Sequence, residues 1–402
     1  MKNNKYTFKH TTYSLPLIFL LILIPFFLAA QKKVPVIKSS IDNVVIKDGK
    51  NIRLNWRLEP SANPDIYYIN IPRKKGITTL KTDQGEINFN SKYGKSFNFI
   101  VLLNEKDSCH IQFKAADEPT AIKANTEQEY PVSIPFEIIG SRIYLQGKLN
   151  NERSVKIQFD LGAGTTCINK AIASQSGLTF NSQTLVNNTQ GTNLSKTSTG
   201  NQLTIGALSW QEVPFTEVSN MQSHEDLIIG NSLFRDKVIE IDYDLQLLTV
   251  HERLPKKAKR FATQPVLFEQ HRPKLEVYFQ HEEKLYSHWF LFDTGREGTM
   301  LIGEDFTQQK KYWKELEELQ LINGKKIIRL DAIVGGVKIN DIVTNAADPS
   351  KPGGRGSLLG NQVLSKFNVI LDNLNGAIYL SPNKRTNTPY SDYAAYLKEF
   401  SK

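Results

Sequence analysis

Two aspartates of the chain stand in closely similar surroundings and could act together in proton transfer. Asp160 begins the segment Asp-Leu-Gly-Ala-Gly-Thr, and Asp293 begins the segment Asp-Thr-Gly-Arg-Glu-Gly-Thr. A carboxyl group can take up or give away a proton during a reaction, although a single Asp before Gly is usually a turn residue. Each of the two follows an apolar run that predicts a β-strand, at residues 155–159 and 288–292. Both carboxylates are therefore expected at strand ends, which hold a side chain firmly.

The similarity between the two regions continues well beyond the aspartates. Downstream in each lie two apolar residues and a Gly, with Gly230 placed 70 residues after Asp160 and Gly360 placed 67 residues after Asp293. When these glycines are aligned without a gap, further positions match: Ile239 with Val369, Ile241 with Leu371, Asp242 with Asp372, Leu248 with Ile378 and Val250 with Leu380. This shared order predicts an internal duplication. The repeated Asp242 and Asp372 lack the Asp-x-Gly context and are expected to form turns.

The duplicated part, roughly residues 134–380, resembles the two lobes of an aspartic protease of the retropepsin and pepsin type, in a bacterial exported version. The resemblance rests on the two paired signatures, each an Asp-x-Gly loop followed later by two apolar residues and Gly. It implies two β-barrel lobes, each of which contributes one Asp at a pseudo-two-fold axis. The site residues that it implies are the catalytic pair Asp160 and Asp293, the active-site loop residues Leu161, Gly162, Ala163, Thr294, Gly295 and Arg296, and the loop-supporting residues Ile228, Ile229, Gly230, Leu358, Leu359 and Gly360.

The resemblance also implies a reaction. Two carboxyls about 3 Å apart hold one proton between them and titrate as a unit. The charged member draws a proton from a water that attacks the peptide carbonyl, while the neutral member hydrogen-bonds the developing oxyanion. No metal ion and no organic cofactor is required. The implied function is that of an aspartic endopeptidase acting on peptides or proteins.

Two residues depart from the family pattern. The family has a Thr after each Asp, which donates a hydrogen bond across the axis; Thr294 is kept, but Leu161 takes the other place. Arg296 is unusual after the second Gly, because a guanidinium close to the pair would lower the pKa of both carboxyls. The effect would be weak if Arg296 pointed outward to Glu297 or Glu304. These departures keep an alternative open, a catalytically impaired protein that binds peptides or envelope partners.

Residues 1–30 resemble a signal peptide, which predicts an exported protein, periplasmic or secreted. They combine three lysines, an apolar run at residues 15–28 and the small pair Ala29-Ala30. A retained membrane anchor through residues 13–30 is the alternative, because Leu28 is bulky where a cleavage site prefers a small residue. Removal of these residues takes three lysines and no acids, so the net charge falls from +9 to +6. The basic residues are scattered, which predicts no nucleic-acid partner, and a monomer is expected.

The predicted fold is mainly β, with an N-terminal β-sandwich-like domain before the two lobes. The expected segments are a small β-sandwich-like domain at 31–118, a linker at 119–130, the first lobe at 131–254, a linker at 255–263, the second lobe at 264–384 and a tail with a helix at 385–402. The hairpin signal in the first domain is an Asp48-Gly49 turn between residues 44–46 and 52–56. No cluster of catalytic or metal-ligand type lies in this domain.

Three further expectations concern local structure. The polar stretch Asn187–Gly200 predicts either an ordinary exposed hairpin or a mobile loop that could close over a site. Helical spacing of apolar residues predicts an amphipathic helix over residues 304–321, and a terminal helix is expected over residues 392–400. Cys109 and Cys167 are expected to remain unpaired because they fall in different domains.

Overall fold

β-strands make up most of the described chain, which confirms the predicted fold class. The computed structural model describes residues 34–49, 52–58, 60, 64–70, 76–115, 123–124, 128–188, 191–308, 310–322, 325–350 and 356–390. The expected export segment at residues 1–30 and the expected helix at residues 392–400 lie outside these ranges. Within them, no helix is both long and apolar enough to cross a membrane. Residues Pro35–Lys402 form one compact unit.

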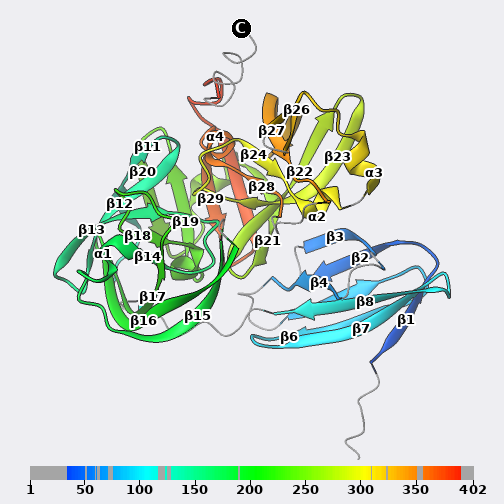
Figure 1. Ribbon diagram of the computed structural model, residues 1–402, viewed down its shortest axis with the longest axis horizontal. Coiled ribbons are helices and arrows are strands. Elements are labelled where there is room, and N and C mark those ends of the chain that lie inside the picture. Colours follow the sequence, from blue (N-terminus) through cyan, green and yellow to red (C-terminus); the bar gives the residue numbers. More distant parts are fainter. Residues whose placement is uncertain are drawn as a thin grey trace, which may run out of the picture. The chain divides into compact units, whose positions relative to one another are not determined.

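The N-terminal part is a β-sandwich of two four-stranded sheets, with the strand orders β1-β7-β8-β4 and β3-β2-β5-β6 (Figure 1, blue to cyan). Its strands are β1 (Val36–Ser39), β2 (Asn43–Asp48), β3 (Ile52–Arg57), β4 (Asp65–Tyr68), β5 (Gly76–Lys81), β6 (Glu86–Ser91), β7 (Ser96–Leu103) and β8 (Asp107–Lys114). Side chains on one face of β8 are buried, namely Cys109, Ile111 and Phe113, because successive residues of a strand point to opposite faces. The predicted hairpin is present, since β2 and β3 pair antiparallel around the Asp48-Gly49 turn. Leu267 of the second lobe belongs to the same core.

The first lobe is a curved sheet that closes on itself. Its elements are β9 (Lys123–Ala124), β10 (Val132–Pro135), β11 (Glu137–Ile139), β12 (Arg142–Leu149), β13 (Arg153–Phe159), β14 (Cys167–Asn169), α1 (Lys170–Ala173), β15 (Phe180–Asn188), β16 (Gly191–Ile205), β17 (Leu208–Val218), β18 (Leu227–Ile229), η1 (Asn231–Phe234), β19 (Val238–Asp242) and β20 (Leu247–His251). The strand order is β11-β12-β13-β18-β14-β17-β16-β15, and an additional pairing of β12 with β16 closes the barrel.

The second lobe has the same strand order at a later place in the chain. Its elements are η2 (Lys256–Arg260), β21 (Ala262–Glu269), β22 (Arg272–His281), β23 (Lys284–Phe292), β24 (Met300–Ile302), α2 (Glu304–Thr307), α3 (Lys310–Glu315), β25 (Gln320–Ile322), β26 (Lys325–Val334), β27 (Val337–Ala346), β28 (Leu358–Leu359), α4 (Asn361–Leu364), β29 (Phe367–Asp372) and β30 (Ala377–Pro382). The order β21-β22-β23-β28-β24-β27-β26-β25 repeats that of the first lobe strand for strand, and β22 pairs with β26 as β12 does with β16.

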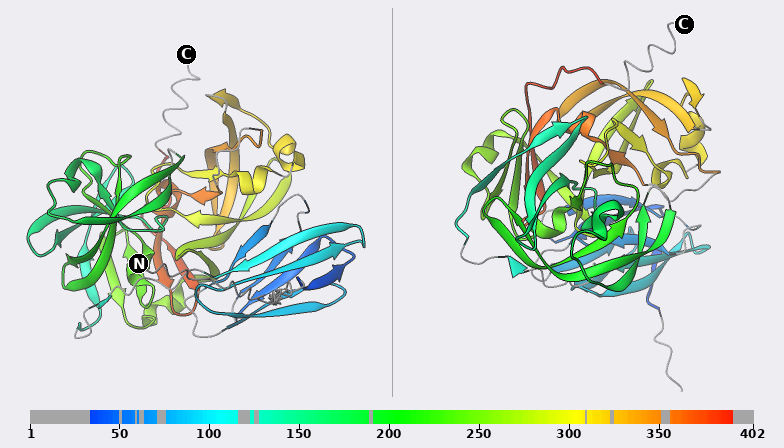
Figure 2. Two further views of the ribbon diagram at one scale, coloured as in Figure 1. Left: turned by 60° about the horizontal axis from the view of Figure 1, so that its bottom comes forward. Right: turned by 60° about the vertical axis from the view of Figure 1, so that its left-hand side comes forward.

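A sheet with three strands from each lobe joins the two lobes, in the order β10-β20-β19-β29-β30-β21. At its centre β19 pairs antiparallel with β29, with Ile239 opposite Leu371 and Ile241 opposite Val369. Figures 1 and 2 show β29, in orange-red, between the green strands of the first lobe and the yellow strands of the second. Ile239 is aligned in sequence with Val369 but lies opposite Leu371, and Ile241 is aligned with Leu371 but lies opposite Val369. An approximate two-fold axis through the sheet requires this exchange.

The predicted helix over residues 304–321 is wrong in extent. The structure has the short helices α2 and α3 there, and then β25. Phe306 and Leu316 are buried as expected, but Leu319 is 41% exposed and its N–H donates to Ile327 O. Strand pairing with β26 thus ends the helical segment, because that N–H cannot also bond within a helix.

Two other local predictions are refined by the structure. The polar stretch 187–200 belongs to a long antiparallel hairpin, β15–β16, whose exposed strands carry Leu185 opposite Leu194. A turn at Gly335 and Gly336, whose φ angles of 58° and 76° favour glycine, joins β26 to β27. Asp372 forms a turn as predicted, since its carboxylate accepts from the N–H groups of Leu374 and Asn375.

Candidate active site

The first aspartate loop is held by the apolar-apolar-Gly strand. β13 runs parallel to β18, with Phe159 opposite Ile229, and β18 also pairs with β14 beyond the loop. The N–H of Asp160 donates to Ile229 O at 2.9 Å, which continues this ladder by one residue. Ala163 N–H donates to Asp160 O at 3.1 Å and closes the turn. Strand β18, with Ile228 at its centre, thus lies under both ends of the loop.

The second loop is built in the same way. β23 runs parallel to β28, with Phe292 opposite Leu359 and Leu291 opposite Leu358, and β28 also pairs with β24. Asp293 N–H donates to Leu359 O at 3.0 Å, the counterpart of the bond in the first loop. Each aspartate therefore sits at a strand end that two neighbouring strands support.

The two loops bring their carboxyls together. The N–H of Gly295 donates both to Asp160 Oδ1 at 3.0 Å and to Asp293 Oδ1 at 3.1 Å. A second N–H reaches each carboxyl, from Gly162 to Asp160 Oδ1 at 2.7 Å and from Arg296 to Asp293 Oδ1 at 3.0 Å. The two carboxyls also interact electrostatically with each other. Residues 133 positions apart in the sequence thus form one half-buried pair.

Close packing explains the glycines of the two loops. A Cβ on Gly162 would lie 2.7 Å from Asp293 Cγ, and a Cβ on Gly295 would overlap the Asp160 carboxylate. The supporting glycines are equally confined, because a Cβ on Gly230 or Gly360 would overlap a carbonyl oxygen of the loop above it. A side chain at any of these positions would push the two aspartates apart or move a loop.

Thr294 braces the first loop from the second lobe. Its hydroxyl accepts from Leu161 N–H at 2.9 Å and donates to Phe159 O at 3.0 Å. Leu161, at the matching place in the first loop, is fully buried within the core and cannot return such a bond. The cross-brace is therefore one-sided, with a hydroxyl on one side and apolar packing on the other.

The environment distinguishes the two aspartates electrostatically. Burial and the negative charge of Asp293 raise the pKa of the Asp160 carboxyl above its ordinary value of 3.8. Burial also raises the pKa of Asp293, but there the positive charge of Arg296 and its backbone N–H act in the opposite direction. The charge of Arg296 therefore favours the ionised form of Asp293, whereas the charge of Asp293 disfavours the ionised form of Asp160.

Arg296 acts on this pair without lying between the two carboxyls. Its Nη2 donates to Met300 O at 3.2 Å and to Asn345 Oδ1 at 3.5 Å, on strands β24 and β27 of its own lobe. The guanidinium thus contributes positive charge from the second-lobe side of the pair.

Other reactive groups near the loops are not arranged for catalysis. Burial and the charge of Asp160 raise the pKa of the Cys167 thiol to about 12, which keeps it protonated. Both Cys167 and Cys109 are buried, and neither forms a disulfide. Nowhere in the described ranges do three or more His, Cys, Asp or Glu side chains gather as a metal site would require.

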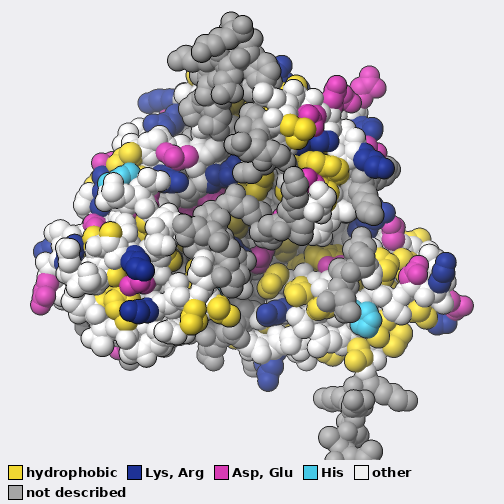
Figure 3. Space-filling view, in the orientation of Figure 1, with side chains coloured by type: hydrophobic (Ala, Val, Ile, Leu, Met, Phe, Trp, Pro, Cys, Tyr) yellow, Lys and Arg dark blue, Asp and Glu magenta, His cyan; other side chains and the backbone are white. Residues whose placement is uncertain are grey.

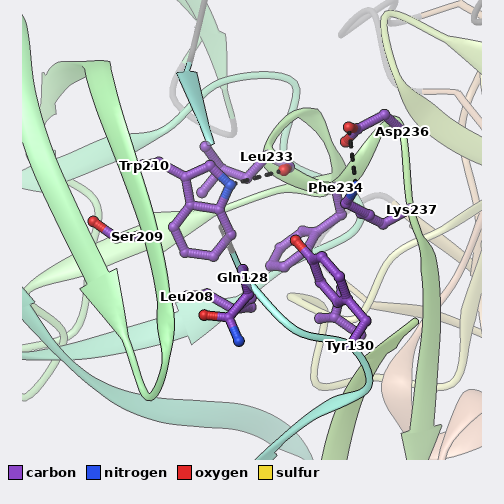
Figure 4. A pocket seen from close by; sticks show the side chains of 10 residues that line it. Gln128, Tyr130, Leu208, Ser209, Trp210, Leu233, Phe234, Asp236 and Lys237 are labelled. Carbon is purple, nitrogen blue, oxygen red and sulfur yellow. Dashed lines mark hydrogen bonds and ion pairs between the residues drawn. The ribbon is translucent and has the colours of Figure 1, made fainter. Parts of the chain in front are cut away.

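The described surface away from the aspartate loops includes an apolar pocket and scattered basic side chains. An apolar pocket of the first lobe is lined by Trp210, Phe234 and Tyr130 among others, and Trp210 Nε1 donates to Leu233 O beside it (Figure 4). None of its lining residues belongs to either aspartate loop. On the face shown in Figure 3, basic side chains are scattered among acidic and neutral ones, without a continuous basic stripe.

The sequence gives no indication of one further contact, which is made to the second aspartate loop. Arg142, at the start of β12, donates from Nε to Gly295 O at 2.8 Å, and Gln158 Nε2 reaches the same oxygen at 3.4 Å. The contact joins residues 153 positions apart, and neither polar residue stands in a recognisable motif. One related feature of the sequence is Arg272, which begins β22 as Arg142 begins β12. The two arginines can be matched once the strand bounds are known.

Comparison with known proteins found similarity to a family model and to a solved structure. Residues 145–236 match the family model described as "gag-polyprotein putative aspartyl protease". The first lobe is similar to these aspartyl proteases. A solved structure, the aspartic proteinase from Irpex lacteus, matches at 12% sequence identity with a TM-score of 0.45, over 64% of this chain and 99% of that chain. No curated protein matches the chain in sequence.

The part similar to aspartyl proteases includes Asp160 and the support residues Ile228, Ile229 and Gly230. It ends before β21, so the family match does not include Asp293. The case for the second aspartate therefore rests on the hydrogen bonds of its loop.

Proposed function

We propose that this chain is an aspartic endopeptidase that hydrolyses peptide bonds with a water activated by Asp160 and Asp293. The observation that carries the proposal is the single N–H of Gly295, which donates to both carboxyls and so fixes them side by side. The matching support of both loops by β18 and β28 adds to it. A carboxyl pair of this kind can donate one proton and accept another, and the hydrolysis of an amide by water requires both steps.

The reaction assigns different roles to the two aspartates. Ionised Asp293 takes a proton from the water as its oxygen attacks the peptide carbonyl carbon, and protonated Asp160 hydrogen-bonds the carbonyl oxygen as negative charge develops there. When the C–N bond breaks, a proton passes to the leaving amine, so that one water and one peptide bond yield a carboxyl and an amine. The roles follow from Arg296, whose charge favours the ionised form of Asp293.

The alternative of a catalytically impaired binding protein has less support. It would require the pair to be disrupted, whereas the N–H of Gly295 donates to both carboxyls. The loss of Thr at position 161 is offset by complete burial of Leu161. Arg296, the other departure, hydrogen-bonds to Met300 and Asn345 of its own lobe.

The decisive experiment measures proteolysis of a denatured-protein mixture from acidic to neutral pH, as new amino termini formed. The wild type is expected to cut, and Asp160→Asn and Asp293→Asn are each expected to reduce the rate by at least about a thousandfold, because each removes one half of the acid–base pair. Asp242→Asn is the matched control, since Asp242 only accepts the Leu245 N–H in a turn. Equal rates in all four proteins, or no cleavage by the wild type, would overturn the proposal.

The place of action is also proposed, from residues 1–30 alone. We propose that the peptidase is exported and acts on peptides or proteins outside the cytoplasm as a monomer. Cell fractionation with amino-terminal sequencing of the full-length product tests export and cleavage. Recovery of an uncleaved protein in the membrane fraction would favour the retained anchor through residues 13–30, and recovery from the cytoplasm would contradict export.

A further inference from the structure

We propose that Arg142 is a positioning residue of the first lobe that holds the aspartate loop of the second lobe in its active geometry. The inference rests on the proposed peptidase function and names a residue that neither paired signature contains. Arg142 does not touch the reacting carboxyls. It acts through the peptide group between Gly295 and Arg296.

That peptide group is held at both ends. Its carbonyl oxygen accepts from Arg142 Nε at 2.8 Å, and its N–H, which belongs to Arg296, donates to Asp293 Oδ1 at 3.0 Å. A peptide group is planar, so a bond that fixes its oxygen also fixes the direction of its N–H. A charged donor on the oxygen further polarises the group and strengthens the N–H bond to the carboxylate.

A buried acid fixes the guanidinium. Glu225 is 2% exposed, and its Oε1 accepts from Arg142 Nη1 at 3.2 Å and from the Tyr144 hydroxyl at 2.6 Å. Its Oε2 accepts from Gln222 N–H at 2.7 Å. A buried carboxylate with this many donors is held in one orientation, and so is the arginine that it pairs with. Glu225, Tyr144 and Gln222 lie in the first lobe, whereas Arg142 also reaches the second lobe, through Gly295 O and, at 4.0 Å from its Nη2, through Glu297 Oε2.

The turn before Arg142 adds contacts to the same loop. Ser141 Oγ donates to Glu297 O at 2.9 Å, and Asn361 Nδ2 donates to Ser141 O. The turn before β12 is therefore docked on the second lobe through both the hydroxyl and the carbonyl of Ser141, which keeps the guanidinium of the next residue within reach of Gly295 O.

The second lobe does not repeat this arrangement. Arg272 begins β22 as Arg142 begins β12, but its Nη2 donates to Glu269 Oε1 at 2.8 Å and its Nε to Glu269 O at 3.3 Å. Both bonds remain within the second lobe. Among the described residues the two arginines in equivalent places thus differ in their hydrogen bonds, because Arg142 donates to the aspartate loop of the other lobe and Arg272, although it lies beside Gly164, donates to Glu269 of its own lobe. Arg272 is therefore the matched control.

The test uses the full chain and the variant Arg142→Met, which keeps an apolar stem but removes every donor. A peptide that the wild type cuts serves as the substrate. Loss of a hydrogen bond from a charged group should lower kcat by about tenfold or more. KM should change little, because the variant affects the aspartate loop and not the contacts that bind the substrate peptide. Amide exchange of residues 292–300 should become about tenfold faster, while exchange of residues 158–166 stays as in the wild type. Arg272→Met should leave both quantities near the wild-type values.

A second variant separates positioning from folding. Arg142→Met leaves Glu225 buried without its cation, which lowers stability by itself. The double variant Arg142→Met/Glu225→Gln removes both charges and should recover the melting temperature, while kcat stays low and exchange of residues 292–300 stays fast. Recovery of kcat together with the melting temperature would overturn the proposal, as would an Arg142→Met protein with unchanged kcat and exchange. If the wild type cuts nothing, the peptidase assignment fails, and the exchange measurement still decides whether Arg142 holds the loop.

Discussion

The hydroxyl of Thr294 offers the sharpest test of how the two loops are held together. Thr294→Val replaces this hydroxyl by a methyl group of nearly the same size, so packing is preserved and only hydrogen bonds are lost. Two backbone groups lose a partner, Leu161 N–H and Phe159 O. Thr294 is fully buried, so water does not replace the hydroxyl.

The size of the effect follows from these two groups. A buried polar group that loses its partner costs about 1–3 kcal/mol, so the two together should lower the free energy of unfolding by about 2–6 kcal/mol. That is a large part of the roughly 5–15 kcal/mol by which folded proteins are stable. Thr294→Ser keeps the hydroxyl and removes one methyl group, which should cost only about 1 kcal/mol.

The measurement is urea unfolding of the full chain followed by circular dichroism, with the free energy extrapolated linearly to water. A second control is Thr299→Val, which removes the hydroxyl of another buried threonine that makes one bond, to Val343 O at 2.9 Å. It should cost about half as much as Thr294→Val. If Thr294→Val is no more destabilising than Thr294→Ser, the hydroxyl does not brace the loops and the account of the junction is wrong.

Two other changes probe the pair itself. Gly295→Ala places a methyl group where the Asp160 carboxylate lies and should lower kcat by about 10- to 100-fold through strain of about 1–3 kcal/mol. Gly164→Ala is the control and should keep the wild-type rate, because its Cβ would lie 3.7 Å from its nearest neighbours. Equal rates for the two alanine variants would contradict the close approach of the loops. Arg296→Met removes a positive charge that lowers the pKa of Asp293. In this variant the pKa of Asp293 should rise, so Asp293 ionises only at higher pH and the acid limb of the kcat/KM profile moves to higher pH. A shift in the opposite direction would refute the assignment of Asp293 as the base.

Sequence reasoning reached the parts of the site that depend on short segments. An apolar run ending in Asp and Gly predicts a strand that delivers a carboxylate into a turn, and β13 and β23 both do this. The downstream Gly230 and Gly360 could be identified because close packing against a loop permits no side chain there. Such constraints act on one or two neighbouring residues and can therefore be recognised in the sequence.

The remaining features depend on contacts between distant segments. Arg142 could not be singled out, because its bond to Gly295 O requires the register of both barrels and the joining sheet of β19 and β29. The helix predicted over residues 304–321 failed for a related reason. Its apolar residues have helical spacing, but the N–H of Leu319 pairs with Ile327 in a hairpin. Tertiary pairing overrode the local pattern.

The two lobes share a strand order but hold each other's loops by different means. The first loop is braced from the second lobe through the Thr294 hydroxyl, which accepts from Leu161 N–H. The second loop is braced from the first lobe through Arg142, which donates to Gly295 O. Each brace therefore crosses the junction once, in opposite directions, and each fixes a backbone group next to an aspartate. Replacement of Thr by Leu161 in the first loop leaves the junction bonded from both sides, because Arg142 makes the second connection.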